Sequence, residues 1–206
     1  MTQFELLLLA LFSITVLAAI AAMVAIVRGR RRVALRIGRA SALGWLLYFG
    51  AVTLASAVIP QQTYLAGEDL CFDEMCFAVT GVQRMSRIGT ARPSGSFYLV
   101  LIRASNHARG RTQRESGIQP LLWDETTAHR ASEAGQRAWE AGHENPPLTT
   151  RIAPGESFTS VQVFDLPATA KPKSLSFDHG LTPEYLVFGE SPLVRPPKII
   201  RLDDVQ

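Results

Sequence analysis

The sequence is poor in the residues that usually build catalytic or metal sites. It has four histidines and two cysteines in 206 residues, and no two histidines stand in an H-E-x-x-H or H-x-H arrangement that would place two ligands on one face. No G-x-S-x-G motif presents a nucleophile, and no glycine-rich loop follows a strand to hold phosphate. We therefore expect no cofactor, no bound metal and no enzymatic activity. An enzyme whose site is assembled from distant residues, such as His129, His143 and His179, is the alternative.

Charged side chains are absent from two long apolar runs, residues 6–27 and 40–59. A helix of about 20 residues is about 30 Å long, which matches the hydrocarbon thickness of a bilayer. One charged side chain at the centre of such a helix would cost about 2.5 to 3.5 kcal/mol. We therefore predict two transmembrane helices in residues 1–60. The runs also lack the intramembrane ionisable groups that usually mark a transport path.

The segment between the two runs, residues 28–39, carries six arginines and no acidic residue. Short loops rich in Lys and Arg stay in the cytoplasm, so both the N-terminus and residues 61–206 should lie on the extracytoplasmic side of the membrane. Residues 55–57, Ala-Ser-Ala, match a signal-peptidase pattern. Cleavage after Ala57 is therefore an alternative, and it would leave the C-terminal part on the same side.

Dividing the chain at residue 60 explains its basic pI near 9.1. Residues 1–60 contain six arginines and one glutamate, whereas the remainder contains 15 basic and 17 acidic side chains. The excess of positive charge is thus a topology signal, and we expect no nucleic-acid partner. The bilayer is the expected lipid partner. Small residues recur at helical spacing in both runs, which predicts close packing of the helix pair, with a homo-oligomer interface as the alternative. They are Ala18, Ala22, Ala25, Gly44, Ala51 and Ala55.

Cys71 and Cys76 are the only cysteines, and the predicted topology places them in an oxidising compartment. An extended chain would separate their Cα atoms by about 17 Å, but a disulfide needs about 4.4 to 6.8 Å. A disulfide therefore requires a turn at Asp73 and Glu74. A redox-active pair and an intermolecular bridge are the alternatives.

Residues 61–206 have the size of one ordinary domain, and their short apolar runs are divided by Gly, Pro and Asp. Such a pattern predicts a mainly β domain built as an antiparallel sandwich. The expected strands are Cys76–Val82, Phe97–Ala104, Ile118–Trp123, Ser157–Phe164, Ser174–Phe177, Tyr185–Phe188 and Lys198–Leu202. An insert near residues 130–150 interrupts them, because Ala131, Ala134, Ala138 and Trp139 recur at helical spacing. We expect a short helix within residues 131–142, ended by Asn145-Pro-Pro, and a turn at Pro154-Gly155.

Several of these features together resemble a known family. They are the Cys71–Cys76 opening, the Phe97–Asn106 strand, the Leu121–Asp124 strand and turn, and Pro154-Gly155 leading to residues 163–167. Residues 65–190 resemble the telokin-like, immunoglobulin-fold domains of bacterial membrane-anchored proteins of unknown function. The resemblance implies an immunoglobulin-like sandwich with an interaction or accessory role, and it offers no catalytic residues. The double span in place of a lipid anchor and the insert depart from the family pattern.

The most distinctive charged feature of the outer part is the loop after the strongest strand, which carries Arg109, Arg111 and Arg114. Guanidinium groups suit phosphate and carboxylate ligands, so this loop is the predicted binding surface. A solvated loop balanced by Glu115, Asp124 and Glu125 is the alternative. We expect the domain to act by contacting an extracytoplasmic protein. A ligand-sensing or envelope-anion-binding module is the second hypothesis.

Overall fold

The computed structural model describes residues 3–58, 60–178 and 197–203. The chain divides into a helical part and a β-sheet part, and each is described by itself. The helices are α1 (Gln3–Val27), α2 (Arg31–Val58) and α3 (Glu133–Glu140). The strands are β1 (Thr63–Tyr64), β2 (Leu70–Phe72), β3 (Met75–Met85), β4 (Ser96–Asn106), β5 (Gln119–Trp123), β6 (Ala128–Arg130), β7 (Ser157–Leu166), β8 (Ser174–Asp178) and β9 (Ile199–Arg201).

Helices α1 and α2 pack against each other, and Trp45 Nε1 of α2 donates a hydrogen bond of 3.0 Å to Thr15 Oγ1 of α1. The buried and partly buried positions of α1 recur at alternating steps of three and four residues, as in a coiled-coil seam. They are Leu8, Leu11, Thr15, Ala18, Ala22 and Ala25. The alanines of α1 thus lie at the buried seam as predicted, whereas a Cβ atom at Gly44 would meet nothing within 4 Å and Ala51 is exposed. The side chain of Ala55 lies outside the described residues.

The basic segment differs from the predicted loop of residues 28–39. Helix α1 ends in a Schellman motif, in which Gly29 has φ 72°, Gly29 N–H donates to Ile26 C=O and Arg30 N–H donates to Ala25 C=O. Helix α2 then starts at Arg31, so most of the basic segment is helical. Arginine and alanine are good helix formers, which is why the helix extends beyond the apolar run.

The length and composition of Leu8–Val27, with a mean hydropathy of 2.7, would allow it to cross a membrane. Among the described residues no other helix segment meets that criterion. An apolar helix near the N-terminus is typical of a membrane span and also of a signal sequence.

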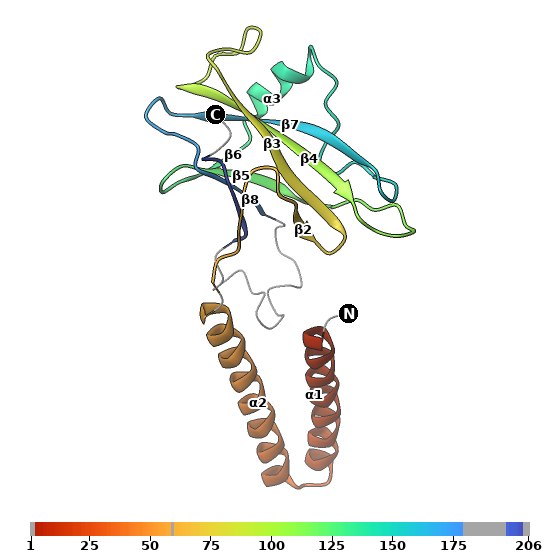
Figure 1. The fold of residues 1–206 in the computed structure, drawn as a ribbon. Helices are drawn as coiled ribbons and strands as arrows, with labels where there is room; N and C mark the ends of the chain where they lie inside the picture. The colour runs from red at the N-terminus through yellow and green to blue at the C-terminus, as the bar shows by residue number, and fades with distance from the viewer. Residues whose placement is uncertain (1–2, 59, 179–196, 204–206) are drawn as a thin grey trace. The chain divides into compact units, whose positions relative to one another are not determined.

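Two sheets form a β-sandwich in the second part of the chain (Figure 1). One has the order β2-β3-β4-β7 and is antiparallel throughout; the other has the order β1-β9-β8-β5-β6. The sheets are not wholly antiparallel as predicted, because β1 and β9 pair in parallel. No hairpin joins these two strands, so nothing in the connection forces opposite directions.

The main core lies between the sheets, and β4 is buried on both faces. Tyr98, Val100 and Ile102 of β4 belong to the core between the sheets. Phe97 and Leu99 point the other way into a second cluster, which Trp139 of α3 helps to cover. Burial on both faces explains the continuous apolar run of β4 in the sequence.

Six of the seven expected strands are confirmed, as β3, β4, β5, β7, β8 and β9, and the expected Tyr185–Phe188 strand lies outside the described residues. The expected helix is confirmed as α3. Ser132 caps its N-terminus by accepting a hydrogen bond from Gly135 N–H at 3.2 Å. Strands β1, β2 and β6 were not predicted. Each has only two or three residues, too few for a periodic pattern.

The segment around α3 closes the free edge of β7. Val161 N–H donates to Asn145 Oδ1 at 2.7 Å, and Asn145 Nδ2 returns a bond of 2.9 Å to Val161 C=O. Val163 N–H donates to Gln136 Oε1 at 3.0 Å, and Val163 C=O accepts from Ser132 N–H at 2.7 Å. These contacts occupy the backbone groups that an unprotected edge strand would offer to another strand.

Candidate functional site

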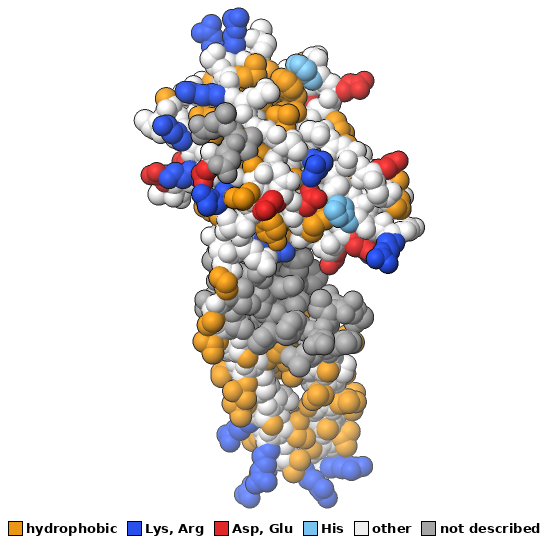
Figure 2. All heavy atoms as spheres, viewed as in Figure 1, with side chains coloured by type: hydrophobic (Ala, Val, Ile, Leu, Met, Phe, Trp, Pro, Cys, Tyr) orange, Lys and Arg blue, Asp and Glu red, His pale blue; other side chains and the backbone are white. Residues whose placement is uncertain are grey.

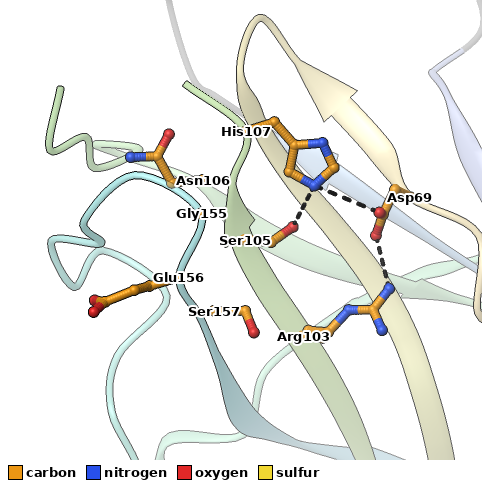
Figure 3. A pocket seen from close by; sticks show the side chains of 8 residues that line it. All are labelled: Asp69, Arg103, Ser105, Asn106, His107, Gly155, Glu156 and Ser157. Atoms are coloured by element: carbon orange, nitrogen blue, oxygen red, sulfur yellow. Dashed lines mark hydrogen bonds and ion pairs between the residues drawn. The ribbon is translucent and has the colours of Figure 1, made fainter. Parts of the chain in front are cut away.

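An open cavity of about 430 Å³ lies where the C-terminal end of β4 meets the start of β7 and the segment before β2 (Figure 3). Seven of its eight lining residues have polar or charged side chains. The lining residues are Asp69, Arg103, Ser105, Asn106, His107, Gly155, Glu156 and Ser157. The alternation of side chains along β4 puts Arg103 and Ser105 on one face, which the sequence alone could have indicated. That Asp69 faces them follows only from the pairing of β2, β3 and β4.

Asp69 is the central charge of this cavity. Its Oδ1 accepts a hydrogen bond of 3.0 Å from Arg103 Nη2, and its Oδ2 lies 3.7 Å from His107 Nε2. Figure 3 shows Arg103, Ser105 and His107 around Asp69, whereas the Glu156 and Asn106 side chains point away from it. The side chains of His107 and Arg103 are 54% and 39% exposed, so these ion pairs are hydrated and add little stability.

Ser105, His107 and Asp69 do not form a catalytic relay, although the three residue types are those of a serine hydrolase. Ser105 Oγ lies 3.2 Å from His107 Nε2, the same nitrogen that faces Asp69. A relay needs the carboxylate on one imidazole nitrogen and the hydroxyl on the other. Ser105 is also only 8% exposed, and its hydroxyl lies 3.5 Å from the Cys76 carbonyl. The hydroxyl is held as a structural group.

Asn106 organises the two loops beside the cavity. Its side chain is fully buried, its Nδ2 donates to the carbonyls of Arg111 and Ile152 at 2.9 Å each, and its Oδ1 accepts from Ala108 N–H at 2.9 Å. One amide therefore satisfies three backbone groups from two different loops. Asn106 is the last residue of β4. Nothing in the surrounding sequence distinguishes it from an ordinary residue at a strand end.

The structure separates the three arginines of the predicted binding loop. Arg111 pairs with Glu74 in the β2–β3 turn, with Nη2 2.8 Å from Oε2, and Gln113 also donates to that carboxylate. These hydrogen bonds, that of Arg111 first, lower the pKa of Glu74. Arg109 and Arg114 are exposed and have no ion pair within the part of the chain that the structure describes. Two of the three guanidinium groups are therefore available to a partner.

The acidic residues expected to balance this loop have other partners. Asp124 contacts His129 at 3.0 Å, and Glu125 pairs with Lys173 at 2.8 Å. The pair with Lys173 lowers the pKa of Glu125 and raises that of Lys173. Glu115 has an interaction of its own. Asp124 and Glu125 thus pair with residues other than the arginines of the loop, and the alternative of a solvated loop stays a prediction.

Cys71 and Cys76 form the predicted disulfide, with a Cα–Cα distance of 4.0 Å. The two residues are directly opposite each other in the β2–β3 hairpin. The turn required between them is present, since Asp73 has φ 52°, a conformation that Asp adopts more readily than most residues. The bond also holds Glu74 where Arg111 and Gln113 reach it.

The three described histidines, His107, His129 and His143, do not gather into a metal site. His129 contacts Asp124, and His143 stacks on Trp139 with 3.7 Å between ring centroids. His179 lies outside the described residues. Within residues 3–58, 60–178 and 197–203, no group of three or more His, Cys, Asp or Glu side chains is placed to hold a metal ion.

Asp124 gives the sandwich a pH-dependent contact. The hydrogen bond with His129, followed by those from Thr126 and Thr127 N–H, lowers the pKa of Asp124 to about 2. Because the native carboxylate binds its proton less readily than the unfolded one, its contribution to stability is complete above about pH 4. That contribution is lost as the pH falls from about 4 toward 2.

We therefore expect Asp124→Asn to flatten the dependence of stability on pH between about pH 5 and 2. The free energy of unfolding, measured by urea titration of the full chain at each pH, is the readout. Asp73→Asn is the matched control, since Asp73 is exposed and its side chain has no hydrogen bond within the described structure. If the free energy of unfolding of Asp124→Asn changed with pH as steeply as that of the wild type, Asp124 would not be the source of the pH dependence.

The sequence matches no family model, and no curated protein is similar to it in sequence. Four solved structures are similar to it at a low level, three of which are as follows. The secreted protein MPT63 of Mycobacterium tuberculosis has a TM-score of 0.44 and 15% identity, covering 59% of this chain and 92% of its own. A conserved hypothetical protein of Bacillus anthracis has a TM-score of 0.43 and 14% identity, covering 56% and 88%. An uncharacterized β-sandwich protein of Clostridium difficile has a TM-score of 0.41 and 10% identity, covering 70% and 95%.

Proposed function

We propose that the chain is a two-pass membrane protein that displays an immunoglobulin-like sandwich outside the cytoplasmic membrane and acts there by binding another protein. The observation that carries the membrane part is the distribution of exposed apolar side chains. Among the described residues, Leu65 is the one large hydrophobic exposed outside α1 and α2. The sandwich thus has the surface of a water-exposed domain, while the helix pair does not.

Both helices, rather than α1 alone, carry this apolar surface (Figure 2). Leu17 and Met23 of α1 are 66% and 68% exposed, and Leu46 and Leu54 of α2 are 69% and 68% exposed. In water each such side chain would forgo roughly 1.5 to 3 kcal/mol of burial free energy. A continuous apolar surface of this extent on a helix pair fits lipid tails.

The orientation rests on charge and on cysteine chemistry, which agree. The arginines between the spans favour the cytoplasm by the positive-inside rule. The sandwich is then outside, where a disulfide such as Cys71–Cys76 persists.

The immunoglobulin-like character of the sandwich is supported by the order of its strands. Naming β3, β4, β5, β6, β7, β8 and β9 as A, B, C, C′, E, F and G gives sheets ordered A-B-E and C′-C-F-G. Each of these strands has the same neighbours as in an immunoglobulin domain, in which the sheet A-B-E-D packs on the sheet C-F-G. The segment around α3 takes the place of strand D beside E (Figure 1).

The end of the sandwich with the cavity is the proposed contact surface. Arg109 and Arg114 of the loop after β4 offer two free guanidinium groups, and the contacts of Asp69 at the end of β4 are partly exposed. The edge of β7 is a poor alternative, because Gln136 and Asn145 already occupy its backbone groups. Binding through end loops on a rigid sandwich is a common arrangement.

The topology can be tested with two matched glycine positions. A Cβ atom added at Gly38 in the basic segment or at Gly142 in the sandwich would meet no atom within 4 Å. In intact cells a membrane-impermeant maleimide should label Gly142→Cys and not Gly38→Cys, and both should react in broken cells. Labelling of Gly38→Cys alone in intact cells would reverse the orientation.

The binding role predicts a defined crosslinked partner in intact cells. Charge reversal by Arg109→Glu and Arg114→Glu should reduce the yield at least about fivefold, as expected for the loss of two charge-assisted contacts. Arg87→Glu is the control, since Arg87 is exposed and lies outside the proposed surface. A yield that is the same in all variants would exclude the loop as the contact.

The free guanidinium groups favour anion binding as a second candidate function. An envelope polyanion should then bind the purified full chain less tightly as salt rises, and Arg109→Glu with Arg114→Glu should abolish that binding. Enzymatic activity is not part of the proposal, because Asp69 and Ser105 share one nitrogen of His107.

A further inference from the structure

We propose that the arginines between the two helices form a binding site for anionic phospholipid headgroups of the cytoplasmic leaflet. This inference rests on the two-pass topology proposed above, and it gives the basic segment a role in addition to orientation. The site, here called the arginine patch, consists of Arg28, Arg30, Arg31, Arg32, Arg36 and Arg39. In Figure 2 a group of blue side chains marks this end of the helix pair.

The arginine patch has no internal counter-charge. All six residues are exposed, and none has an ion pair in the described structure. Along the sequence no Asp or Glu stands between Glu5 and Glu68. Neither helix can therefore supply a carboxylate near the arginines, and their charge is left for something outside the helix pair.

The helical geometry concentrates this charge on one face of α2. Positions 32, 36 and 39 are four and three residues apart, so the three arginines lie within about 60° of each other around the helix axis. Like charges at this spacing repel each other. The first turn of α2 also has arginine instead of an acidic residue, which is the unfavourable sign for a helix N-terminus. An external anion would relieve both effects.

In the proposed topology these arginines lie at the same depth along the membrane normal as the lipid phosphates. Arg39 comes directly before the second apolar run, and Arg32 is seven residues, or about 10 Å, farther along the helix. The headgroup layer on each side of the hydrocarbon is roughly 5 to 8 Å thick. The arginine face of α2 therefore passes through the phosphate layer, where guanidinium groups can form paired hydrogen bonds.

A lipid fits this site better than an acidic protein segment, because both neighbouring runs are apolar. If both helices span the bilayer, the arginines are held at the membrane surface at all times, next to a dense layer of phosphates. Basic side chains beside a span attract anionic lipid, by about fivefold for each residue near the surface. A soluble acidic partner would have to compete with that layer.

Lipid binding can be measured with the purified full chain in neutral detergent by native mass spectrometry. The probes are phosphatidylglycerol and phosphatidylcholine with identical acyl chains. The wild-type chain should retain phosphatidylglycerol preferentially. In Arg32→Gln/Arg36→Gln/Arg39→Gln that preference should fall on the order of 100-fold, and it should also fall with rising salt. Arg87→Gln/Arg92→Gln/Arg130→Gln, which removes the same charge from exposed positions of the sandwich outside the proposed contact surface, should behave as wild type.

A second variant separates binding from orientation. Arg32→Lys/Arg36→Lys/Arg39→Lys keeps the charge, so it should insert normally and retain most of the preference. Insertion of every variant is checked by resistance to alkaline extraction and by labelling of Gly38→Cys. Failure of the wild-type chain there would refute the two-pass proposal itself. Normal insertion with equal retention of both lipids, or a preference unchanged in the glutamine variant, would overturn the lipid site and leave an acidic protein segment as its occupant.

Discussion

Asn106→Ala is expected to lower the free energy of unfolding of the sandwich by about 3 to 5 kcal/mol. The substitution removes both donors that bind the Arg111 and Ile152 carbonyls and the acceptor for Ala108 N–H. Two of these bonds are fully buried, so water cannot replace them without opening the loops. Each buried group left unpaired costs about 1 to 3 kcal/mol. Because whole domains are stable by only about 5 to 15 kcal/mol, the loss would be severe.

Asn145→Ala is the matched control for this prediction. Asn145 also bonds a strand backbone through both ends of its amide, at 2.7 and 2.9 Å to Val161. It is only partly buried at the sheet edge, where water can take over, so a loss of about 1 kcal/mol is expected. Denaturant unfolding of the full chain, followed by tryptophan fluorescence, gives both values. Equal losses in the two variants would show that burial does not set the cost.

Asn106→Ala should also affect the proposed contact surface. The amide joins the loop after β4 to the loop before β7, and both border the cavity. Release of the Arg111 carbonyl would free the segment that carries Arg109 and Arg114. Partner crosslinking should therefore decrease even at temperatures where the variant is still folded, which distinguishes a positioning role from simple unfolding.

The second large effect is expected for Gly95→Ala, which should lower the free energy of unfolding by roughly 2 to 4 kcal/mol. A Cβ atom at Gly95 would lie 2.2 Å from Ala168 N and 2.5 Å from Pro167 C. Both are backbone atoms, which cannot turn away as a flexible side chain can. The chain at the start of β4 would have to separate from the end of β7, where Ser94 is bound to Asp165 by three hydrogen bonds of 2.9 to 3.0 Å.

Gly142→Ala provides the comparison, because a Cβ atom there would meet nothing within 4 Å. Its effect should be within about 0.5 kcal/mol of zero. The measurement is the urea concentration at the midpoint of unfolding for each alanine variant. If the free energy of unfolding depends equally steeply on urea in both, the difference between the midpoints gives the difference in stability. A Gly95→Ala chain as stable as Gly142→Ala would mean that β4 and β7 can move apart there at little cost.

The strands that the sequence predicted share a local signal. The residues of β4 are apolar on both faces, and β7 and β8 are rich in apolar residues between turn signals, so their own composition marks them. Strands β1, β2 and β6 lack that signal because each has only two or three residues. Strands β2 and β6 form short hairpins with β3 and β5, whereas β1 pairs with the distant β9. The parallel pairing of β1 with β9 depends on how two segments more than 100 residues apart meet, and no local pattern encodes that.

The candidate site shows the same division. The disulfide could be predicted because two cysteines and one turn admit few arrangements. The arginine loop could be predicted as a charged surface, but not the capture of Arg111 by Glu74, which lies 37 positions away in the sequence. The approach of Asp69 to Arg103 and His107 requires β2, β3 and β4 to be aligned in register.

By itself, the sequence determined the two apolar runs, the basic segment between them, the one pair of cysteines and the mainly β character of the remainder. Each depends on composition or on spacing within a few residues, which sets local conformation and preference for lipid or water. Only the tertiary structure decided which arginines are free, which single nitrogen of His107 faces both Asp69 and Ser105, and how the α3 segment closes β7. Those features depend on distances between residues far apart in the chain, and packing alone sets such distances.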